Sequence, residues 1–383
     1  MKKRRILVTL ESRATYGYSK NVMLAMSEFP ELELITLVTG MHLVPELGNS
    51  IALIEADGFP ITERVPMHAS TENCGAWSEA LGTAVAGFAR AYEKLQPDII
   101  LLSGDRIETF GLCVASVYMN IPTAHIQAGD KSGHIDDAAR MAIGKLAHIH
   151  FASCEDSAER LRRMGEQPFR VFNVGAPQLD DIVGGGYRAD KLEVRGATYD
   201  LAEPYLLLVQ HSILVELDEA YEQMRASIDA CLATGMRVFS IHPNSDLGYQ
   251  RILQALKDTG GSDRLVSLPN LDRTQYLTLL ANCRALVGNS SSGILEAPSF
   301  QVPVVNIGNR QRGRPQASNI FNCDPESGQI LAAIKYVLDD PEFKIRCRAA
   351  VNPYGNGKSG RAICEILRDV PLDKNLLDKH TVY

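Results

Sequence analysis

Asp98-Ile99-Ile100-Leu101-Leu102-Ser103-Gly104-Asp105-Arg106 is the stretch of this 383-residue sequence that decides the fold. Its apolar half is typical of a parallel β-strand that helices cover on both faces. The strand runs directly into a glycine turn that carries a carboxylate and a guanidinium. Short β-branched runs of this kind alternate with amphipathic stretches, such as 77–95, along the whole chain. This alternation predicts an α/β fold with parallel sheets.

The same pattern continues on both sides of the central strand and is interrupted once. A further helix is expected over 136–146. Strands are expected at 6–10, 35–39, 122–127, 148–152, 205–210, 237–241, 264–267, 285–288 and 302–306. The polar, turn-rich stretch up to Pro204 separates the two halves. We therefore predict two Rossmann-like domains, 1–175 and 176–360, with the ligand site in the cleft between them. A single larger sheet is the alternative.

Composition excludes several classes of protein. Hydrophobic residues make up 45% and charged residues 22%, which is typical of a globular chain. The formal net charge of −7 gives no general attraction to nucleic acid or to anionic lipid. No apolar run approaches the roughly 18 residues that span a bilayer. Eight cysteines without a CxxC pair or a zinc spacing indicate reduced thiols. We expect a cytoplasmic protein with no membrane, nucleic-acid or metal partner.

One segment has the properties of a phosphate-binding turn. Gly288-Asn289-Ser290-Ser291-Ser292-Gly293-Ile294-Leu295-Glu296 follows a predicted strand and opens a predicted helix. Free backbone N–H groups, serine hydroxyls and a helix start can together bind phosphate. Arg310, Arg312 and Arg314 add positive charge that suits a diphosphate. An ordinary serine N-cap and a solvated loop are the alternatives for the two features.

The first half of the chain supplies carboxylates near the ends of its predicted strands. They are Asp105, Glu108, Asp130, Asp136 and Asp137. Carboxylates that face a sugar are suited to acid/base chemistry when one is ionised and another holds a proton. Asp136 or Asp137 could instead cap a helix, and Glu108 could pair with Arg106. Asp105 has no comparable structural explanation.

Taken together, the motifs resemble the UDP-N-acetylglucosamine 2-epimerases, and especially their hydrolysing branch. The resemblance covers almost the whole chain. It rests on the order and spacing of segments 12–17, 38–43, 104–106, 125–148, 174–177, 242–244, 288–296, 306–314 and 352–355. Two departures stand out. Thr15 replaces the acid of the family's Arg-Ala-Asp-Tyr, and Ala128-Gly129-Asp130 replaces its Gly-Gly-Glu.

The resemblance implies a GT-B-like arrangement of the two domains, with UDP held mainly by the second. Residues 361–383 would form a helix and tail that cross back to the first domain. Asp105, Asp130, Asp136 or Asp137 would face the sugar, and His211 would assist at the diphosphate. The implied nucleotide contacts are Arg13, Lys20, Arg106, His211, Asn244, Ser290, Ser291, Glu296 and Arg310. No metal or redox cofactor is implied, and the assembly would be a homodimer or homotetramer.

The implied reaction starts from a UDP-linked 2-acetamido sugar. UDP is eliminated across C1–C2 to give a 2-acetamidoglycal, and water then adds while C2 is protonated from the opposite face. The first expected substrate is UDP-N-acetylglucosamine, with N-acetylmannosamine as the product. The same reaction could instead act on UDP-2,4-diacetamido-2,4,6-trideoxyglucose, on the route to legionaminic acid. A GT-B glycosyltransferase, or a UDP-sugar binder without activity, would also fit these motifs.

Overall fold

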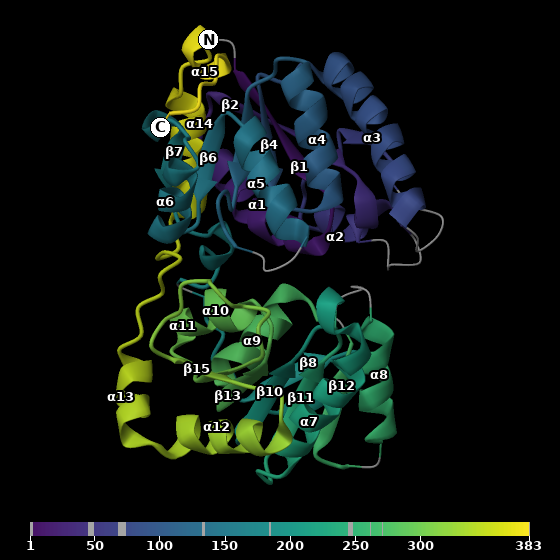
Figure 1. The fold of residues 1–383 in the computed structure, drawn as a ribbon, viewed down its shortest axis with the longest axis vertical. Coiled ribbons are helices and arrows are strands. Elements are labelled where there is room, and N and C mark those ends of the chain that lie inside the picture. The colour runs from purple at the N-terminus through teal and green to yellow at the C-terminus, as the bar shows by residue number, and fades with distance from the viewer. Residues whose placement is uncertain are drawn as a thin grey trace. The chain divides into compact units, whose positions relative to one another are not determined.

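The computed structural model describes residues 3–44, 50–67, 74–131, 135–183, 185–243, 248–260, 262–269 and 271–382. The chain divides into two compact units, one of Met1–Asp181 with Tyr354–Tyr383 and one of Ile182–Pro353. Each unit contains a parallel sheet with helices packed on it (Figure 1). The predicted α/β class with two Rossmann-like domains is confirmed. The predicted cleft between the domains stays a prediction.

The first unit is built on a parallel sheet. Its strands are β1 (Arg4–Leu10), β2 (Leu32–Val38), β3 (Glu63–Arg64), β4 (Ile99–Ser103), β5 (Thr123–Ile126), β6 (Ile149–Ala152) and β7 (Val171–Asn173). Among the described residues their order is β3-β2-β1-β4-β5-β6-β7. β4 is buried at every position, as its apolar run predicts. The order reverses between β1 and β4, and ligands bind beyond the carboxyl ends of strands at such a switch point.

Helices pack on both faces of this sheet. They are α1 (Arg13–Met26), α2 (Ile51–Ala56), α3 (Cys74–Leu95), α4 (Ile107–Tyr118), α5 (Ile135–Leu146), α6 (Glu155–Arg163), α14 (Ser359–Asp369) and α15 (Lys374–Leu377). One core joins the sheet to α1, α2 and α14. The other joins it to α3, α4 and α5. Both faces of the central strands are therefore covered, which explains why they read as continuous apolar runs.

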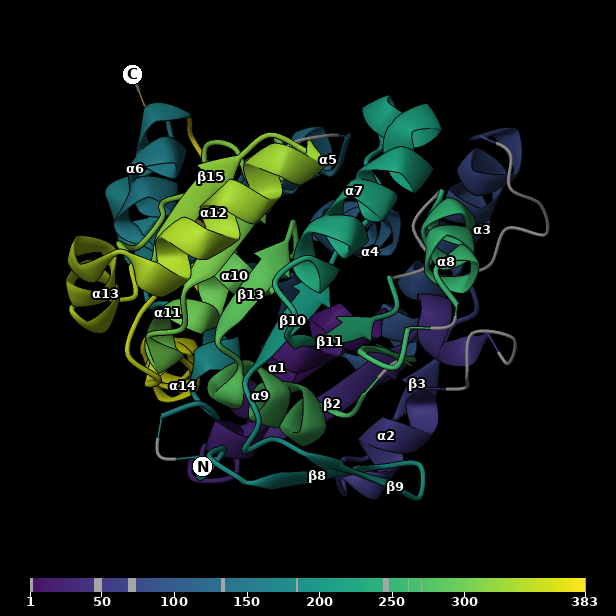
Figure 2. The same ribbon diagram turned by 90° about the horizontal axis from the view of Figure 1, so that it is seen from below.

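The second unit is also built on a parallel sheet with helices packed on it. Its strands are β10 (Tyr205–Val209), β11 (Arg237–Ile241), β12 (Leu265–Leu268), β13 (Ala285–Gly288), β14 (Val304–Ile307) and β15 (Ile320–Cys323). Its helices are α7 (Ala220–Leu232), α8 (Tyr249–Asp258), α9 (Arg273–Asn282), α10 (Ser292–Leu295), α11 (Ala297–Phe300), α12 (Ser327–Asp339) and α13 (Pro341–Arg348). The strand order is β12-β11-β10-β13-β14-β15, so the switch point lies between β10 and β13. Figure 2 shows α7 and α12 side by side over this sheet.

The structure differs from the predicted elements in the short and exposed strands. The stretch expected to be an irregular linker contains an antiparallel hairpin of β8 (Lys191–Val194) and β9 (Ala197–Asp200). Strands β3, β7 and β15 were not predicted, because runs of two to four partly exposed residues carry little periodic signal.

The division of the chain lies after Asp181 and Pro353, whereas the sequence placed boundaries after residues 175 and 360.

The C-terminal segment is anchored to the first unit. The Asp180 carboxylate accepts hydrogen bonds from the backbone N–H groups of Ser359 and Gly360, at 3.0 and 2.6 Å. The fully buried Arg170 guanidinium donates to backbone oxygens of α15 and of the residue after it. The Lys379 ammonium donates to three carbonyl oxygens at the end of α5 and pairs with Glu166 at 2.6 Å.

The Lys379→Met variant should lose about 1.5–3 kcal/mol in its free energy of unfolding, the usual value of a hydrogen bond to a charged group. Methionine keeps the aliphatic stem but leaves the carbonyl groups of α5 and the buried Glu166 carboxylate without this cation. Urea denaturation measures the effect. Lys374→Met is the matched control, because Lys374 is exposed on α15. Equal losses in the two variants would contradict the proposed anchor.

Candidate functional site

At the switch point of the first unit, β1 runs into the N-terminus of α1. Ser12 caps this helix, and its side chain and that of Thr15 form a capping box. The Thr15 hydroxyl accepts from the N–H groups of Glu11 and Ser12 and donates to the Ser12 carbonyl oxygen at 3.0 Å. Thr15, which replaces the acid of the family motif, therefore closes a helix turn. Arg13 lies exposed in that first turn.

Asp105 lies in the turn between β4 and α4, after Gly104 with its positive φ of 81°. Its carboxylate is paired with the guanidinium of Arg140 on α5, whose side chain is only 4% exposed. Arg140 also donates to the backbone oxygen of Gln127 at 2.8 Å. Burial lowers the pKa of Arg140, but the Asp105 and Asp130 carboxylates outweigh burial and raise it. Arg140 is thus a buried cation that interacts with two of the predicted catalytic carboxylates, Asp105 and Asp130.

Asp130 lies beyond the end of β5 and is almost fully buried. Its carboxylate accepts from the Ser153 hydroxyl. The preceding Gly129 has φ +74°, and a Cβ there would lie 2.4 Å from the Ser157 carbonyl oxygen. Only glycine fits, which fixes the path of the chain into Asp130. The neighbouring His125 has its pKa lowered to about 3 by burial, so its Nε2–H donates to the Gly104 carbonyl oxygen as a neutral ring.

Three other predicted residues of the first unit lie on helices. Asp137 is half-buried on α5. Asp136 belongs to the same helix, but its side chain lies outside the described part of the structure. Lys20 lies about two turns into α1 and pairs with Asp57 at 2.7 Å. The role of Lys20 at the nucleotide stays a prediction.

At the switch point of the second unit, the ends of β10 and β13 are joined by side-chain hydrogen bonds. The Asn289 amide accepts from the His211 backbone N–H at 2.7 Å and donates to the His211 carbonyl oxygen at 2.8 Å. Gly288 has φ +130°, and a Cβ there would lie 2.1 Å from the Val209 carbonyl oxygen. This close approach places His211 beside the Ser290-Ser291 turn.

The predicted diphosphate residues of the second unit gather at this junction. Arg310 and Gln311 both donate to the Asn289 carbonyl oxygen, at 3.2 and 2.8 Å. Burial, and then the Arg310 charge, lower the pKa of His211 to about 3. His211 is therefore a neutral hydrogen-bonding group at pH 7. Asn244 lies outside the described residues.

The serine turn itself differs from the prediction in one respect. It was expected to open a helix, but α10 has four residues and α11 begins directly after Glu296. Two single turns supply little of the helix dipole. Phosphate binding here would rest on the backbone N–H groups, the hydroxyls of Ser290 and Ser291, and Arg310.

Glu296 is buried, and both of its carboxylate oxygens are engaged within the second unit. Oε1 accepts from Arg273 Nη1 at 2.6 Å, and Oε2 accepts from the Ser292 hydroxyl. Such a fixed carboxylate keeps lone pairs for ribose hydroxyl groups.

Sequence reasoning missed Arg273, and it also missed Arg140 and Asn289. The position of Arg140 about one turn after two aspartates in an amphipathic helix is a signal that could have indicated it.

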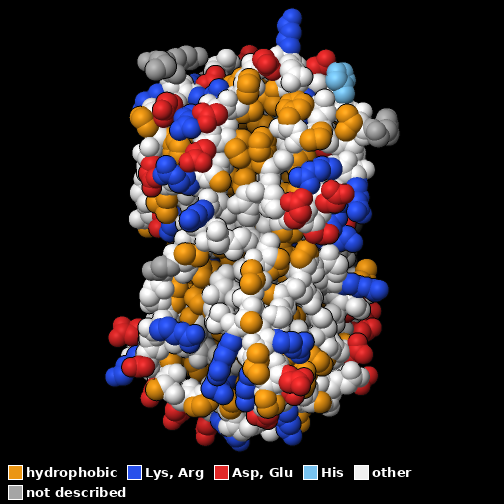
Figure 3. Space-filling model, turned by 90° about the vertical axis from the view of Figure 1, so that its left-hand side faces the viewer, with side chains coloured by type: hydrophobic (Ala, Val, Ile, Leu, Met, Phe, Trp, Pro, Cys, Tyr) orange, Lys and Arg blue, Asp and Glu red, His pale blue; other side chains and the backbone are white. Residues whose placement is uncertain are grey.

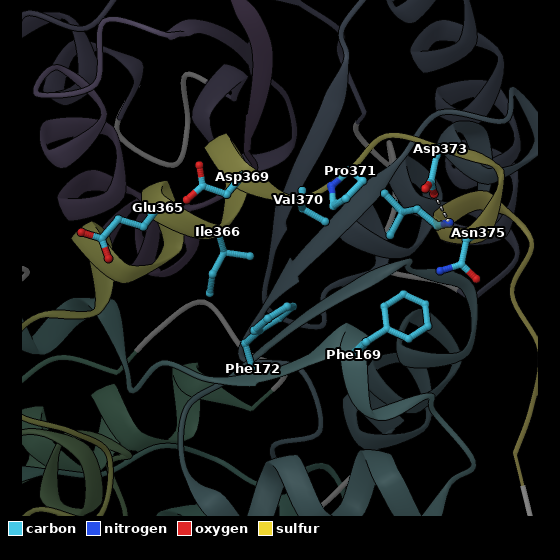
Figure 4. Close-up of a pocket in the computed structure, with 10 residues that line it drawn as sticks. Phe169, Phe172, Glu365, Ile366, Asp369, Val370, Pro371, Asp373 and Asn375 are labelled. Carbon is cyan, nitrogen blue, oxygen red and sulfur yellow. Dashed lines mark hydrogen bonds between the residues drawn. The ribbon is translucent and has the colours of Figure 1, made fainter.

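An apolar cavity of about 430 Å³ lies elsewhere in the first unit, between β7 and the segment from α14 to α15. Figure 4 shows Phe169, Phe172 and Ile366 pointing into it. Figure 3 looks onto this side and shows hydrophobic side chains gathered over the first unit. The cavity is lined by none of the predicted site residues. Within the described part of the chain, no set of three His, Cys, Asp or Glu residues is placed to hold a metal.

None of the helices in the described ranges combines the length and apolarity that a membrane span requires.

The model of the family described as UDP-N-acetylglucosamine 2-epimerase matches residues 24–368. The chain is 34% identical to a UDP-N,N'-diacetylbacillosamine 2-epimerase (hydrolyzing) of Legionella pneumophila, over 99% of this chain and 100% of that protein. It is 31% identical to a UDP-N-acetylglucosamine 2-epimerase of Neisseria meningitidis, over 89% of each.

Solved structures share the fold. The UDP-GlcNAc 2-epimerase from Neisseria meningitidis bound to UDP-GlcNAc matches with a TM-score of 0.78 at 17% identity, over 95% of this chain and 99% of that one. The UDP-GlcNAc 2-epimerase of Methanocaldococcus jannaschii in complex with UDP-GlcNAc and UDP matches with a TM-score of 0.76 at 15% identity, over the same shares. These likenesses confirm the predicted fold.

Proposed function

The chain belongs to the UDP-N-acetylglucosamine 2-epimerase family, and from this premise we propose that it is a hydrolysing 2-epimerase that releases UDP and a free 2-acetamido sugar. The observation that carries the proposal is the full-length match to a hydrolysing relative, since it spans both units. The carboxylates of the first unit and the phosphate-binding groups of the second supply the two kinds of chemistry that the reaction needs.

The first unit would handle the protons. A carboxylate removes the C2 proton, the C2–H electrons form the C1=C2 bond, and the C1–O electrons leave with UDP. Water then bonds to C1 and gives one proton to a carboxylate, while an acid protonates C2 from the opposite face. Asp105, ion-paired with Arg140, and Asp130, hydrogen-bonded to Ser153, lie at the ends of neighbouring strands and would divide these transfers, with Asp136 or Asp137 as a further participant.

The second unit would hold the nucleotide and the departing diphosphate. Arg310, which is anchored on the Asn289 carbonyl oxygen, would pair with the diphosphate charge that develops as C1–O breaks. The neutral His211 would donate one hydrogen bond there without adding charge. Glu296, with the lone pairs that Arg273 and Ser292 leave open, would bind the ribose.

We propose UDP-2,4-diacetamido-2,4,6-trideoxyglucose as the sugar nucleotide, in preference to UDP-N-acetylglucosamine. The Legionella relative, named for diacetylbacillosamine, matches this chain over its whole length and at higher identity than the Neisseria UDP-N-acetylglucosamine enzyme. The product would be the free 2,4-diacetamido mannose-type sugar of a nonulosonic acid route. The relative described as polysialic acid biosynthesis protein P7 supports the same kind of pathway.

A direct rate comparison tests the choice of sugar. We expect kcat/KM for the diacetamido donor to exceed that for UDP-N-acetylglucosamine by at least about tenfold, the low end of what one altered pocket group contributes. UDP release measures both rates under the same conditions. Equal or faster turnover of UDP-N-acetylglucosamine would contradict this choice. UDP release that requires an added sugar acceptor would indicate a glycosyltransferase instead.

A further inference from the structure

Glu11 is a buried carboxyl group at the switch point of the first unit that the mechanism above does not use. It follows the last residue of β1 and has no exposed surface. Its Oε1 accepts from the Thr9 hydroxyl at 2.7 Å. Its Oε2 has no hydrogen-bond partner among the described residues. The Thr15 hydroxyl lies beside this carboxyl and opposes the rise of its pKa.

A second buried carboxylate, Glu108, lies close to Glu11. It is 1% exposed in the first turn of α4, and its Oε2 accepts from Arg106 Nε at 3.3 Å. Gly40 packs closely against both Glu11 and Glu108. A Cβ on Gly40 would lie 2.8 Å from Glu108 Oε1 and 2.8 Å from the Glu11 backbone oxygen. The interior at this point therefore holds two buried carboxyl groups, of which Glu108 pairs with Arg106.

The charges around Glu11 favour its protonated form. Burial, the loss of a hydrogen bond to Oε2 and the neighbouring Glu108 all act against a carboxylate. Burial raises the pKa of Glu11 to about 7. The hydrogen bonds of Thr9 and Thr15 oppose this rise, and the nearby Glu108 charge adds to it. Tyr92 and His42, which also lie nearby, are neutral at pH 7. Burial raises the pKa of Tyr92 well above its usual value and lowers the pKa of His42 to about 4.

We propose that Glu11 is a positioning residue that keeps its proton in the working enzyme, and that loss of this proton sets the basic limit of activity. This inference rests on the proposed function. Glu108 pairs with Arg106, which is one of the predicted nucleotide contacts. When Glu11 ionises, a second buried negative charge is added near Glu108, at the switch point where the sugar-side carboxylates lie. The anionic diphosphate of the substrate is then repelled, so the loss falls mainly on KM.

The Glu11→Gln variant tests the proposal, because glutamine keeps the shape of the protonated acid and cannot ionise. Between about pH 6.5 and about pH 8.5, we expect wild-type kcat/KM to fall roughly 20-fold, as for one group titrating near pH 7. In Glu11→Gln the same ratio should be close to one. Glu79→Gln, an exposed change on α3, is the matched control and should keep the wild-type ratio.

Stability supplies a readout that needs no substrate. A carboxyl with a raised pKa favours the folded state most below its unfolded pKa, and this contribution is lost as pH rises through about 7. The thermal midpoint of Glu11→Gln should therefore rise relative to wild type between about pH 5 and about pH 8. A constant difference between the two proteins across this range would contradict the proposal.

Infrared difference spectroscopy of the wild-type protein keeps the proposal testable if the variant folds poorly. The carbonyl band of a protonated carboxyl should be present at about pH 6 and lost by about pH 9. Its absence at about pH 6 would overturn the proposal, as would an unchanged pH–rate profile in Glu11→Gln. If the protein releases no UDP from any donor, the proposed function is contradicted. The role of Glu11 in limiting activity is then contradicted too. The infrared band still decides whether Glu11 holds the proton.

Discussion

The Asp105→Asn variant should lose about 10²–10⁴-fold in turnover, the usual contribution of a positioned acid or base. Asparagine keeps the shape of the side chain and can still accept a hydrogen bond from Arg140. It cannot accept the C2 proton. The turn that holds residue 105 depends on Gly104 and on the buried β4, neither of which needs a carboxylate. UDP affinity should change little, because UDP is proposed to be held mainly by the second unit.

Asp98→Asn is the matched control. Asp98 lies just before β4, at the opposite end of the strand, where its carboxylate accepts from the Arg5 backbone N–H at 2.8 Å. Donor turnover and calorimetric UDP affinity are measured for both variants. An Asp105→Asn protein that loses UDP affinity as badly as the Arg310 variant would show that Asp105 acts in nucleotide binding or in structure.

The Arg310→Ala variant should weaken UDP binding by about 1.5–3 kcal/mol, the typical value of a charge-assisted hydrogen bond, which is roughly a 10- to 150-fold rise in Kd. The Arg310 guanidinium is held by the Asn289 carbonyl oxygen next to the Ser290 turn. Because Asn289 also binds both backbone groups of His211, Arg310 occupies one fixed position at the junction. Calorimetry with UDP alone measures this effect without any turnover.

Arg312→Ala removes the same charge from the same loop, and Arg312 is exposed. It should change UDP affinity by less than about 0.5 kcal/mol, as for most exposed surface substitutions. Equal losses in the two variants would mean that diffuse positive charge, and not the fixed Arg310, holds the diphosphate.

The buried parallel strands and their polar ends could be predicted from the sequence, because they depend on local pattern. The apolar run at 99–103 and the small-residue turn at 288–293 each identify a strand and the direction of its end. Parallel pairing then brings those ends to one edge of the sheet. Thus Asp105 and Asp130 could be grouped in one half of the chain, and His211 with Ser290 in the other, from the sequence alone.

The partners that fix these side chains could not be predicted, because they come from distant parts of the chain. Arg140 on α5 pairs with Asp105 in the turn after β4. Arg273 on α9 pairs with Glu296 in the same unit. The raised pKa of Glu11 depends on burial and on Glu108, and one of its oxygens lacks a partner among the described residues. No sequence periodicity encodes these contacts.

Incubation with UDP-2,4-diacetamido-2,4,6-trideoxyglucose in heavy water, followed by NMR, tests the proposed reaction most directly. Elimination and re-protonation must exchange the hydrogen at C2, since the proton that returns comes from solvent. We predict one UDP released per free sugar formed, with the mannose-type configuration and one deuterium at C2. A product that keeps its original hydrogen at C2, or a complete lack of UDP release from this donor and from UDP-N-acetylglucosamine, would contradict the assignment.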